Sequence, residues 1–180
     1  MILALLLGAT IAGAAPADTP ANSEYLATMP LAGLVPRTRE RPGVRETDWL
    51  PPGQSFDHAT RVVVIERIAG AAGPEAPMRF IAGVTTCFAP CPDHQDAPVS
   101  QTPVGGRPAA RGTIDLRPNA TFPGPRRVFA LAISGERDLH TVTVMIRGAL
   151  TRADTDFAEA VLRSAVVCTP ASRAAVCRPD

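Results

Sequence analysis

Residues 128–147 have the sequence VFALAISGERDLHTVTVMIR, and this stretch decides the fold. Two runs rich in apolar and β-branched residues flank the segment Gly135-Glu136-Arg137-Asp138, which is typical of a hairpin turn. Side chains alternate between the two faces of a strand. One face of residues 139–147 carries Thr141, Thr143 and Met145, and the other carries Val142, Val144 and Ile146. Because the second face is more apolar, we expect it to pack against another element.

A helix is the expected partner of that face. Over residues 154–167, apolar or small side chains recur at three- and four-residue spacing, as in a helix with one buried side. They are Phe157, Ala160, Val161, Ser164 and Val167. Either Thr151 or Asp154 is suited to cap the start of this helix, because a side-chain oxygen there accepts a hydrogen bond from a free backbone N–H group.

The chain before the hairpin predicts further strands and a second helix. Strands are expected over residues 44–50, 59–69 and 111–117. Residues 74–88 favour a helix, because apolar side chains such as Met78 and Ile81 follow helical spacing there.

The order of these elements predicts the fold class. Residues 89–110 are expected to form a loop or a weak edge region. Strands that follow one another through short turns pair antiparallel. We therefore expect a single α+β domain over residues 44–180, with a mainly antiparallel sheet of four to six strands and two helices packed on it.

The segment before this domain is expected to be a linker. Residues 16–43 are rich in Pro, Ala and Arg, and they end in the turn dipeptide Pro42-Gly43. Their basic stretch, residues 37–41 with the sequence RTRER, has an alternative function as an anion-binding or membrane-surface patch. Glu40 and Glu46 partly offset its charge, so a solvated linker is the preferred interpretation.

Residues 1–15 are interpreted as a signal peptide. They are apolar and uncharged, but too short to span a bilayer, which takes about 20 apolar residues. Small residues favour cleavage after Ala15, with Ala17 as the second choice. No Arg or Lys precedes the apolar run, so a buried helix or an uncleaved anchor is the alternative. Cleavage would leave a periplasmic or secreted protein with no stable membrane span.

Four cysteines agree with export to an oxidising compartment. They are Cys87, Cys91, Cys168 and Cys177, and they allow three disulfide pairings. The local pairing, Cys87 with Cys91 and Cys168 with Cys177, is favoured because each pair flanks a turn that contains proline; a long-range pairing stays open. Redox catalysis by Cys87 and Cys91 is the functional alternative. It is disfavoured because Cys87 ends a predicted helix, where the helix dipole opposes a thiolate.

No other segment carries a motif for catalysis, a cofactor or a metal. Asp93, His94 and Asp96 are metal ligands by type, but the paired spacing of a structural zinc site is missing, so a solvated loop is preferred. The acidic residues at the start of the last helix are interpreted as stabilising the helix dipole rather than as acid/base catalysts. They are Asp154, Asp156 and Glu159. We expect no cofactor, and the net charge of +1 gives no reason to expect a nucleic-acid partner.

Parts of the chain resemble small exported bacterial proteins of uncharacterised function. The resembling stretches are WLPPGQS at residues 49–55, LAISGERDL at residues 131–139, and the closing helix that ends at Cys168. The order of the elements also resembles, more loosely, that of PsbP-like α/β/α domains. This resemblance implies an antiparallel sheet flanked by helices and an accessory role in the cell envelope, and it implies no catalytic residue.

These observations favour a non-catalytic envelope protein that binds another protein or a small ligand. A periplasmic thiol/disulfide or hydrolytic enzyme without a recognisable motif is the alternative, and a purely structural protein is a third. A deep polar cleft that holds His94 or His140 beside carboxylates would count against the first hypothesis.

Overall fold

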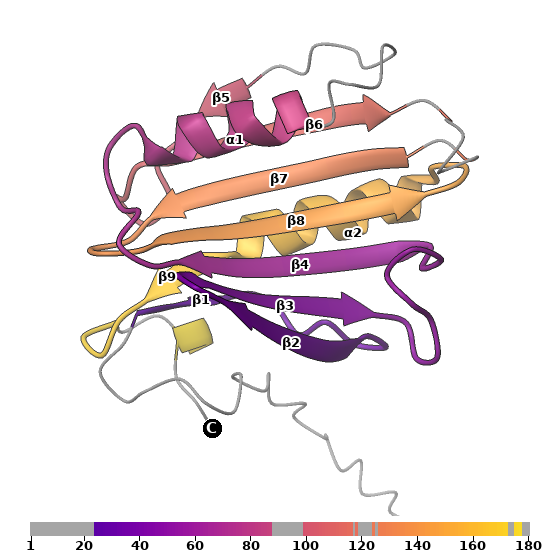
Figure 1. Ribbon diagram of the computed structural model, residues 1–180, viewed down its shortest axis with the longest axis horizontal. Coiled ribbons are helices and arrows are strands. Elements are labelled where there is room, and N and C mark those ends of the chain that lie inside the picture. Colours follow the sequence, from indigo (N-terminus) through magenta and orange to yellow (C-terminus); the bar gives the residue numbers. More distant parts are fainter. Residues whose placement is uncertain are drawn as a thin grey trace, which may run out of the picture.

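The computed structural model describes residues 24–87, 99–116, 118, 124, 126–172 and 175–177, and its main feature is a seven-stranded sheet (Figure 1). In spatial order its strands are β2 (Val35–Arg41), β3 (Val44–Leu50), β4 (Arg61–Ile68), β8 (Leu139–Arg147), β7 (Arg126–Ser134), β6 (Ala109–Leu116) and β5 (Val99–Gln101). All neighbours pair antiparallel. The expected antiparallel α+β architecture is confirmed, but the sheet has seven strands instead of four to six.

The predicted hairpin lies in the middle of this sheet. β7 and β8 pair along their whole lengths, and Ser134 lies opposite Leu139 across the turn formed by residues 135–138. Every residue of β7 except Arg127 is buried. The hairpin therefore forms the central part of the core, as its apolar sequence requires.

Two helices lie on opposite faces of the sheet (Figure 1). α1 (Ala76–Cys87) packs on β5, β6 and β7, and α2 (Arg152–Ser164) packs on β7 and β8. Thr151 caps α2 and forms a capping box with Asp154, so the two alternative cap residues act together. Neither helix of the described ranges has the length and apolarity that a membrane crossing takes.

The face under α2 holds the largest apolar cluster. From β8 it includes Val142, Val144 and Ile146, and from α2 it includes Ala158, Val161 and Leu162. The prediction that a helix covers this face of the hairpin is confirmed. The buried stripe of α2 differs in part from the predicted one, because Ala160 and Ser164 are only partly buried and Val167 lies in the following strand.

The face under α1 is lined by small residues. Ala110, Ala130 and Ala132 are buried against α1 together with Ile81. A Cβ atom at Gly112 would lie 2.9 Å from Cγ2 of Ile81, so the helix lies this near to β6 only because that position is a glycine. α1 packs mainly on β5–β7, and within the described residues no second helix packs on β2–β4 on this face.

The segment expected to be a linker contains two strands. β1 (Tyr25–Ala27) pairs with β9 (Val166–Cys168), and β2 pairs with β3. All seven residues of β2 are exposed, so this strand has no buried face and no hydrophobic alternation that sequence could reveal. The described part of residues 16–43 therefore belongs to the folded domain.

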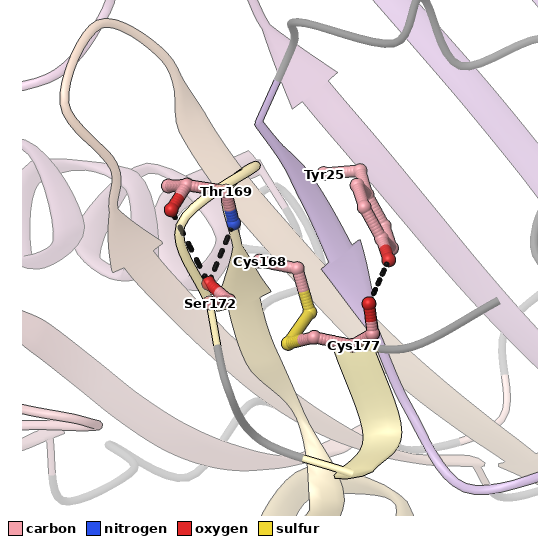
Figure 2. The surroundings of a disulfide bond; sticks show 5 residues. All are labelled: Tyr25, Cys168, Thr169, Ser172 and Cys177. Carbon is pink, nitrogen blue, oxygen red and sulfur yellow. Dashed lines mark hydrogen bonds between the residues drawn. A yellow bond between two sulfur atoms is a disulfide. The ribbon is translucent and has the colours of Figure 1, made fainter.

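A disulfide and a tyrosine hold the 3₁₀ helix at the end of the described residues near β1 and β9 (Figure 2). Cys168 is bonded to Cys177, which lies in the 3₁₀ helix Ala175–Cys177, with a Cα–Cα distance of 5.4 Å. The Tyr25 hydroxyl donates a hydrogen bond of 3.0 Å to the carbonyl oxygen of Cys177. This disulfide is one half of the favoured local pairing. The other half, Cys87 with Cys91, lies outside the described side chains.

Candidate functional site

The turn of the central hairpin binds the carboxylate of Glu24. This side chain is almost fully buried, and it accepts hydrogen bonds from the backbone N–H groups of Glu136 at 2.7 Å, Arg137 at 3.1 Å and Asp138 at 2.7 Å. Gly135 makes this approach possible, because a Cβ atom there would overlap the Glu24 carboxylate. The turn and residue 24 are more than a hundred positions apart in sequence, so this contact fixes the start of the described chain to the centre of the sheet.

His140 and Asp138 lie beside Glu24. The imidazole of His140 is 1% exposed, and its Nε2 lies 3.5 Å from Oε1 of Glu24. Within the described residues, this Nε2 has no hydrogen-bond partner. Asp138 accepts a hydrogen bond of 3.0 Å from the N–H of Gly70 and forms an ion pair of 3.2 Å with Arg67. Two carboxylates and one imidazole thus meet behind the hairpin turn.

The surroundings fix the charge of two of these groups. Burial alone would raise the pKa of Glu24, but the N–H groups of Glu136, Asp138 and Arg137 together lower it. Burial lowers the pKa of His140, and the nearby carboxylate of Glu24 opposes this shift only in part. Glu24 is therefore ionised and His140 neutral near pH 7.

A small pocket adjoins this cluster between β1, β3, β4 and β8. Glu24, His140, Arg45 and Arg67 are among the residues that line it. Its volume is about 60 Å³, which is enough for a few water molecules or an ion. Pockets that bind organic ligands are several times larger, at about 300–1,000 Å³.

A deep polar cleft with a histidine beside carboxylates would argue for catalysis, and within the described residues this cluster has the histidine and the carboxylates but not the deep cleft. His140 does lie beside carboxylates, but the pocket is too small for an organic substrate. The hydroxyl groups that line the pocket are already engaged: Tyr25 donates to Cys177, and Thr47 is 3.1 Å from the Thr38 hydroxyl. The arrangement is suited to holding the fold together or to binding an ion.

A second polar feature covers β2, β3 and β4 on the same face as α1. Arg39 forms ion pairs with Glu46, at 2.6 Å, and with Asp48. Arg41 pairs with Glu46 at 2.7 Å and with Glu66 at 3.6 Å. The two guanidinium groups are 58% and 61% exposed, while the three carboxylates beneath them are at most 18% exposed. Positive groups therefore form the outer layer of this patch. We call Arg37, Arg39 and Arg41, which all lie on β2, the arginine row.

Burial changes the acidity of the carboxylates under the arginine row. It raises the pKa of Asp48, and the neighbouring Arg39 opposes that effect only in part. It also raises the pKa of Glu66, although the Thr141 hydroxyl donates a hydrogen bond of 3.1 Å to this carboxylate. Both carboxylates are thus less stable in their charged form than exposed acids would be.

The remaining predicted residues lie apart from these two features. Asp154 lies in the first turn of α2, where it takes part in the capping box and pairs with Arg61, as its expected role at the helix start requires. Glu159 lies in the middle of α2 and pairs with Arg111, so it does not have the expected role at the helix start. His58 is exposed and hydrogen-bonds to Ser55. Cys91, Asp93, His94 and Asp96 lie outside the described residues.

Sequence reasoning missed Glu24, because it is an isolated acid in a segment without periodicity. The glycine at position 135 was the only signal, and it indicated the turn but not what the turn binds.

The fold is shared with a known protein structure. Cyanobacterial PsbP (CyanoP) from Synechocystis is 14% identical, with a TM-score of 0.52, over 87% of this chain and 98% of that chain. Two structures of Mog1 have lower TM-scores of 0.45. One is a Mog1 mutant, which is 13% identical over 79% of this chain and 87% of that chain. The other is the Ran-binding protein Mog1p of Saccharomyces cerevisiae, which is 11% identical over 81% of this chain and 94% of that chain. No protein-family model and no curated protein matches the sequence. The PsbP-like layout expected from the order of elements is thus supported at the level of fold.

Proposed function

We propose that the protein is an exported, non-catalytic module that binds an extended acidic segment of a partner protein along β2. The observation that carries the proposal is the arginine row on an exposed edge strand. The likeness to CyanoP adds only that the fold is compatible with an accessory role, because an identity of 14% supports no transfer of a ligand.

The position of β2 is suited to binding another strand. It is the last strand of the sheet, and no other strand of the described residues pairs with its outer edge. Extended peptides bind such edges through backbone hydrogen bonds. Val35, at the start of β2, is 46% exposed and offers an apolar contact beside the arginines. This edge, in which Pro36 lacks an N–H group, therefore offers a partner one apolar end and arginines at alternate positions.

The charge of β2 indicates the chemistry of the partner. Arg37, Arg39 and Arg41 alternate along the strand, so their side chains share one face. On a strand added to this edge, carboxylates at alternate positions would lie opposite these guanidinium groups, and opposite charges across strands stabilise pairing. Arg37 forms no ion pair with any described residue, so its charge is available.

A second copy of the chain fits this edge poorly. If β2 pairs antiparallel with itself around Thr38, then Arg37 lies opposite Arg39. Pairing around Arg39 instead sets Arg37 opposite Arg41. Like charges directly opposite one another destabilise a sheet. The arginine row thus disfavours self-association while it favours an acidic strand.

Export is supported by the sequence and by the disulfide. The apolar residues 1–15 have the composition of a signal peptide. Stable disulfides such as Cys168–Cys177 are typical of oxidising compartments. Both cysteines are buried, so this bond is suited to a structural role rather than to thiol exchange. Mass spectrometry of protein from its native host tests this part: loss of residues 1–15 with oxidised Cys168 and Cys177 is expected, and an intact Met1 with reduced thiols would contradict it.

Binding is tested by hydrogen–deuterium exchange with a defined probe. The probe is a synthetic peptide of alternating glutamate and valine, and its control has lysine in place of glutamate. We expect the glutamate peptide to slow amide exchange in β2 and to leave the opposite edge strand β5 unchanged. Slowing by both peptides alike, or by neither, would refute an acidic partner at this edge.

Charge-reversed variants test the role of the arginines. Arg39→Glu with Arg41→Glu should weaken binding at least about tenfold, since each cross-strand charge pair contributes roughly 0.2–1 kcal/mol and reversal adds repulsion. Arg37→Glu should also weaken it, and it breaks no ion pair within the described part of the chain. Arg79→Glu, on the exposed surface of α1, is the matched control and should bind as the wild type does. Unchanged binding by the β2 variants would rule out the arginine row as the binding surface.

A further inference from the structure

His140 carries a buried nitrogen whose hydrogen-bonding capacity is unused. Its Nε2 has no partner among the described residues, although the side chain is 1% exposed. It lies 3.5 Å from Oε1 of Glu24, which is long for a hydrogen bond. Buried polar atoms are nearly always satisfied by protein, water or an ion. If Nε2 carries the proton, it can make only a long hydrogen bond to this oxygen; if Nε2 carries the lone pair, a cation between the nitrogen and the carboxylate removes their repulsion.

Two carboxylates lie near this imidazole. One ligand atom each from Glu24, Asp138 and His140 lies within 4.8 Å of the other two. Nitrogen and oxygen ligands of this kind suit Zn²⁺ and related divalent ions. Zinc bonds to such atoms of about 2.0–2.1 Å place neighbouring ligands of a tetrahedral site about 3.4 Å apart. Nε2 of His140 lies 3.5 Å from Oε1 of Glu24, so the carboxylate is already near that spacing, and it would bind the ion through its other oxygen, Oε2, which accepts only one N–H group.

We infer that Glu24, Asp138 and His140 bind one divalent transition-metal ion of the zinc class behind the turn of the central hairpin. Three protein ligands leave a fourth position, which a water molecule in the adjoining pocket of about 60 Å³ can fill. This site is separate from the β2 edge and does not depend on the function proposed above.

The ligands keep free lone pairs for a metal. An ionised carboxylate offers about four acceptor positions. Glu24 uses three of them for the N–H groups of the turn: Oε1 accepts from Arg137 and Asp138, and Oε2 accepts from Glu136, so the free lone pair is on Oε2. Asp138 accepts one hydrogen bond from Gly70 and faces Arg67. Such contacts orient ligands around a metal, as outer hydrogen bonds do in known sites.

The charges around the site favour a divalent cation. Two carboxylates and one arginine side chain, Arg67, surround the imidazole, which leaves one net negative charge when both acids are ionised. A divalent ion would change this balance to one net positive charge, and pocket water can solvate it. Bound metal would join residue 24 to residues 138 and 140, so it is expected to add to the stability of the domain.

The test titrates metal-free protein without a histidine tag with Zn²⁺ and, separately, with Co²⁺. We expect one ion per chain, and a rise in the unfolding midpoint of about 5–10 °C when Zn²⁺ is in hundredfold excess over its dissociation constant. Bound Co²⁺ should give the strong visible absorption of a four-coordinate ion. Absence of binding at millimolar metal, or the weak spectrum of six-coordinate Co²⁺, would overturn the inference.

Two variants separate a metal ligand from a structural histidine. His140→Gln keeps a polar side chain and should weaken Zn²⁺ binding at least about tenfold. His58→Gln removes an exposed histidine elsewhere and should leave binding unchanged. Asp138→Asn keeps an oxygen for the Gly70 N–H and should also weaken binding, which provides a second test if His140→Gln does not fold. Equal affinity in wild type, His140→Gln and Asp138→Asn would assign the metal to other residues and refute the site.

Discussion

Replacing Glu24 by glutamine tests how much the hairpin turn stabilises the domain. In the wild type, one carboxylate accepts three backbone hydrogen bonds, from Glu136, Arg137 and Asp138. Glutamine has nearly the same shape but only one oxygen. Its NH₂ group would face a backbone N–H, so at least one donor of the turn would lose its acceptor. The substitution therefore removes charge and acceptors while it preserves packing.

The expected loss follows from these contacts. Hydrogen bonds to charged groups contribute roughly 1.5–3 kcal/mol each, and an unsatisfied buried donor costs about 1–3 kcal/mol. The three bonds share one carboxylate and are not additive. We expect Glu24→Gln to lower the free energy of unfolding by about 2–4 kcal/mol. That is a large part of the roughly 5–15 kcal/mol that stabilises a typical domain.

Urea unfolding in the presence of EDTA measures this change without a contribution from metal. The midpoint should fall and the slope should stay constant, because the native structure is retained. Glu136→Gln is the control: its side chain is 69% exposed and its only described ion pair is the 3.3 Å contact with Arg107, so a change within about 0.5 kcal/mol is expected. If Glu24→Gln loses no more than Glu136→Gln, the turn does not depend on the carboxylate and our account of the site is wrong.

Three further substitutions have expected outcomes. Gly135→Ala should destabilise by about 1–3 kcal/mol in urea unfolding, because its Cβ would overlap the Glu24 carboxylate, whereas Gly83→Ala, with no neighbour within 4 Å, should be neutral or stabilising. Replacing both Cys168 and Cys177 by serine should lower stability by roughly 3 kcal/mol, measured as a lower thermal midpoint, because a closed ten-residue loop is lost. Burial raises the pKa of Glu66 in the folded protein, so the charged carboxylate opposes folding. The stability contributed by protonated Glu66 is complete below the pKa of the unfolded state, and it is lost as the pH rises through the pKa of the folded state. Glu66→Gln should therefore gain stability relative to wild type in urea unfolding at pH 7 and lose that advantage near pH 3; an advantage independent of pH would contradict this reasoning.

The sequence predicted the elements that have a buried face. The central hairpin was evident because two runs rich in apolar and β-branched residues flank the turn at residues 135–138. The closing helix was evident from its apolar spacing, and both candidate caps, Thr151 and Asp154, take part in the capping box. In these elements the local pattern and the tertiary environment agree, which makes prediction from one sequence possible.

The elements that were missed have polar or very short sequences. β2 has no buried residue, so no period distinguishes it from a solvated linker. β5, in the range expected to be a loop or a weak edge region, is such an edge: it has only three residues and pairs with β6. Glu24 was missed for a different reason: its partners are backbone N–H groups more than a hundred residues away, and backbone groups leave no trace in the amino-acid sequence. Sequence indicated the turn, and only the fold shows which side chain occupies it.

β4 contributes residues both to the arginine row's ion pairs and to the cluster around His140. Its side chains alternate between the two faces of the sheet, which explains how these two sites can act separately. Glu66 faces the arginine row and pairs with Arg41, whereas the next residue, Arg67, faces the opposite side and pairs with Asp138 beside His140. Neighbouring side chains of a strand point to opposite faces, so the sheet itself separates the two sites. A partner on β2 would contact the outer guanidinium groups without displacing Arg67. Binding of the acidic peptide and binding of Zn²⁺ should therefore be energetically independent, and an affinity for the peptide that changes more than about threefold with Zn²⁺ would show a coupling of roughly 0.7 kcal/mol that this geometry does not explain.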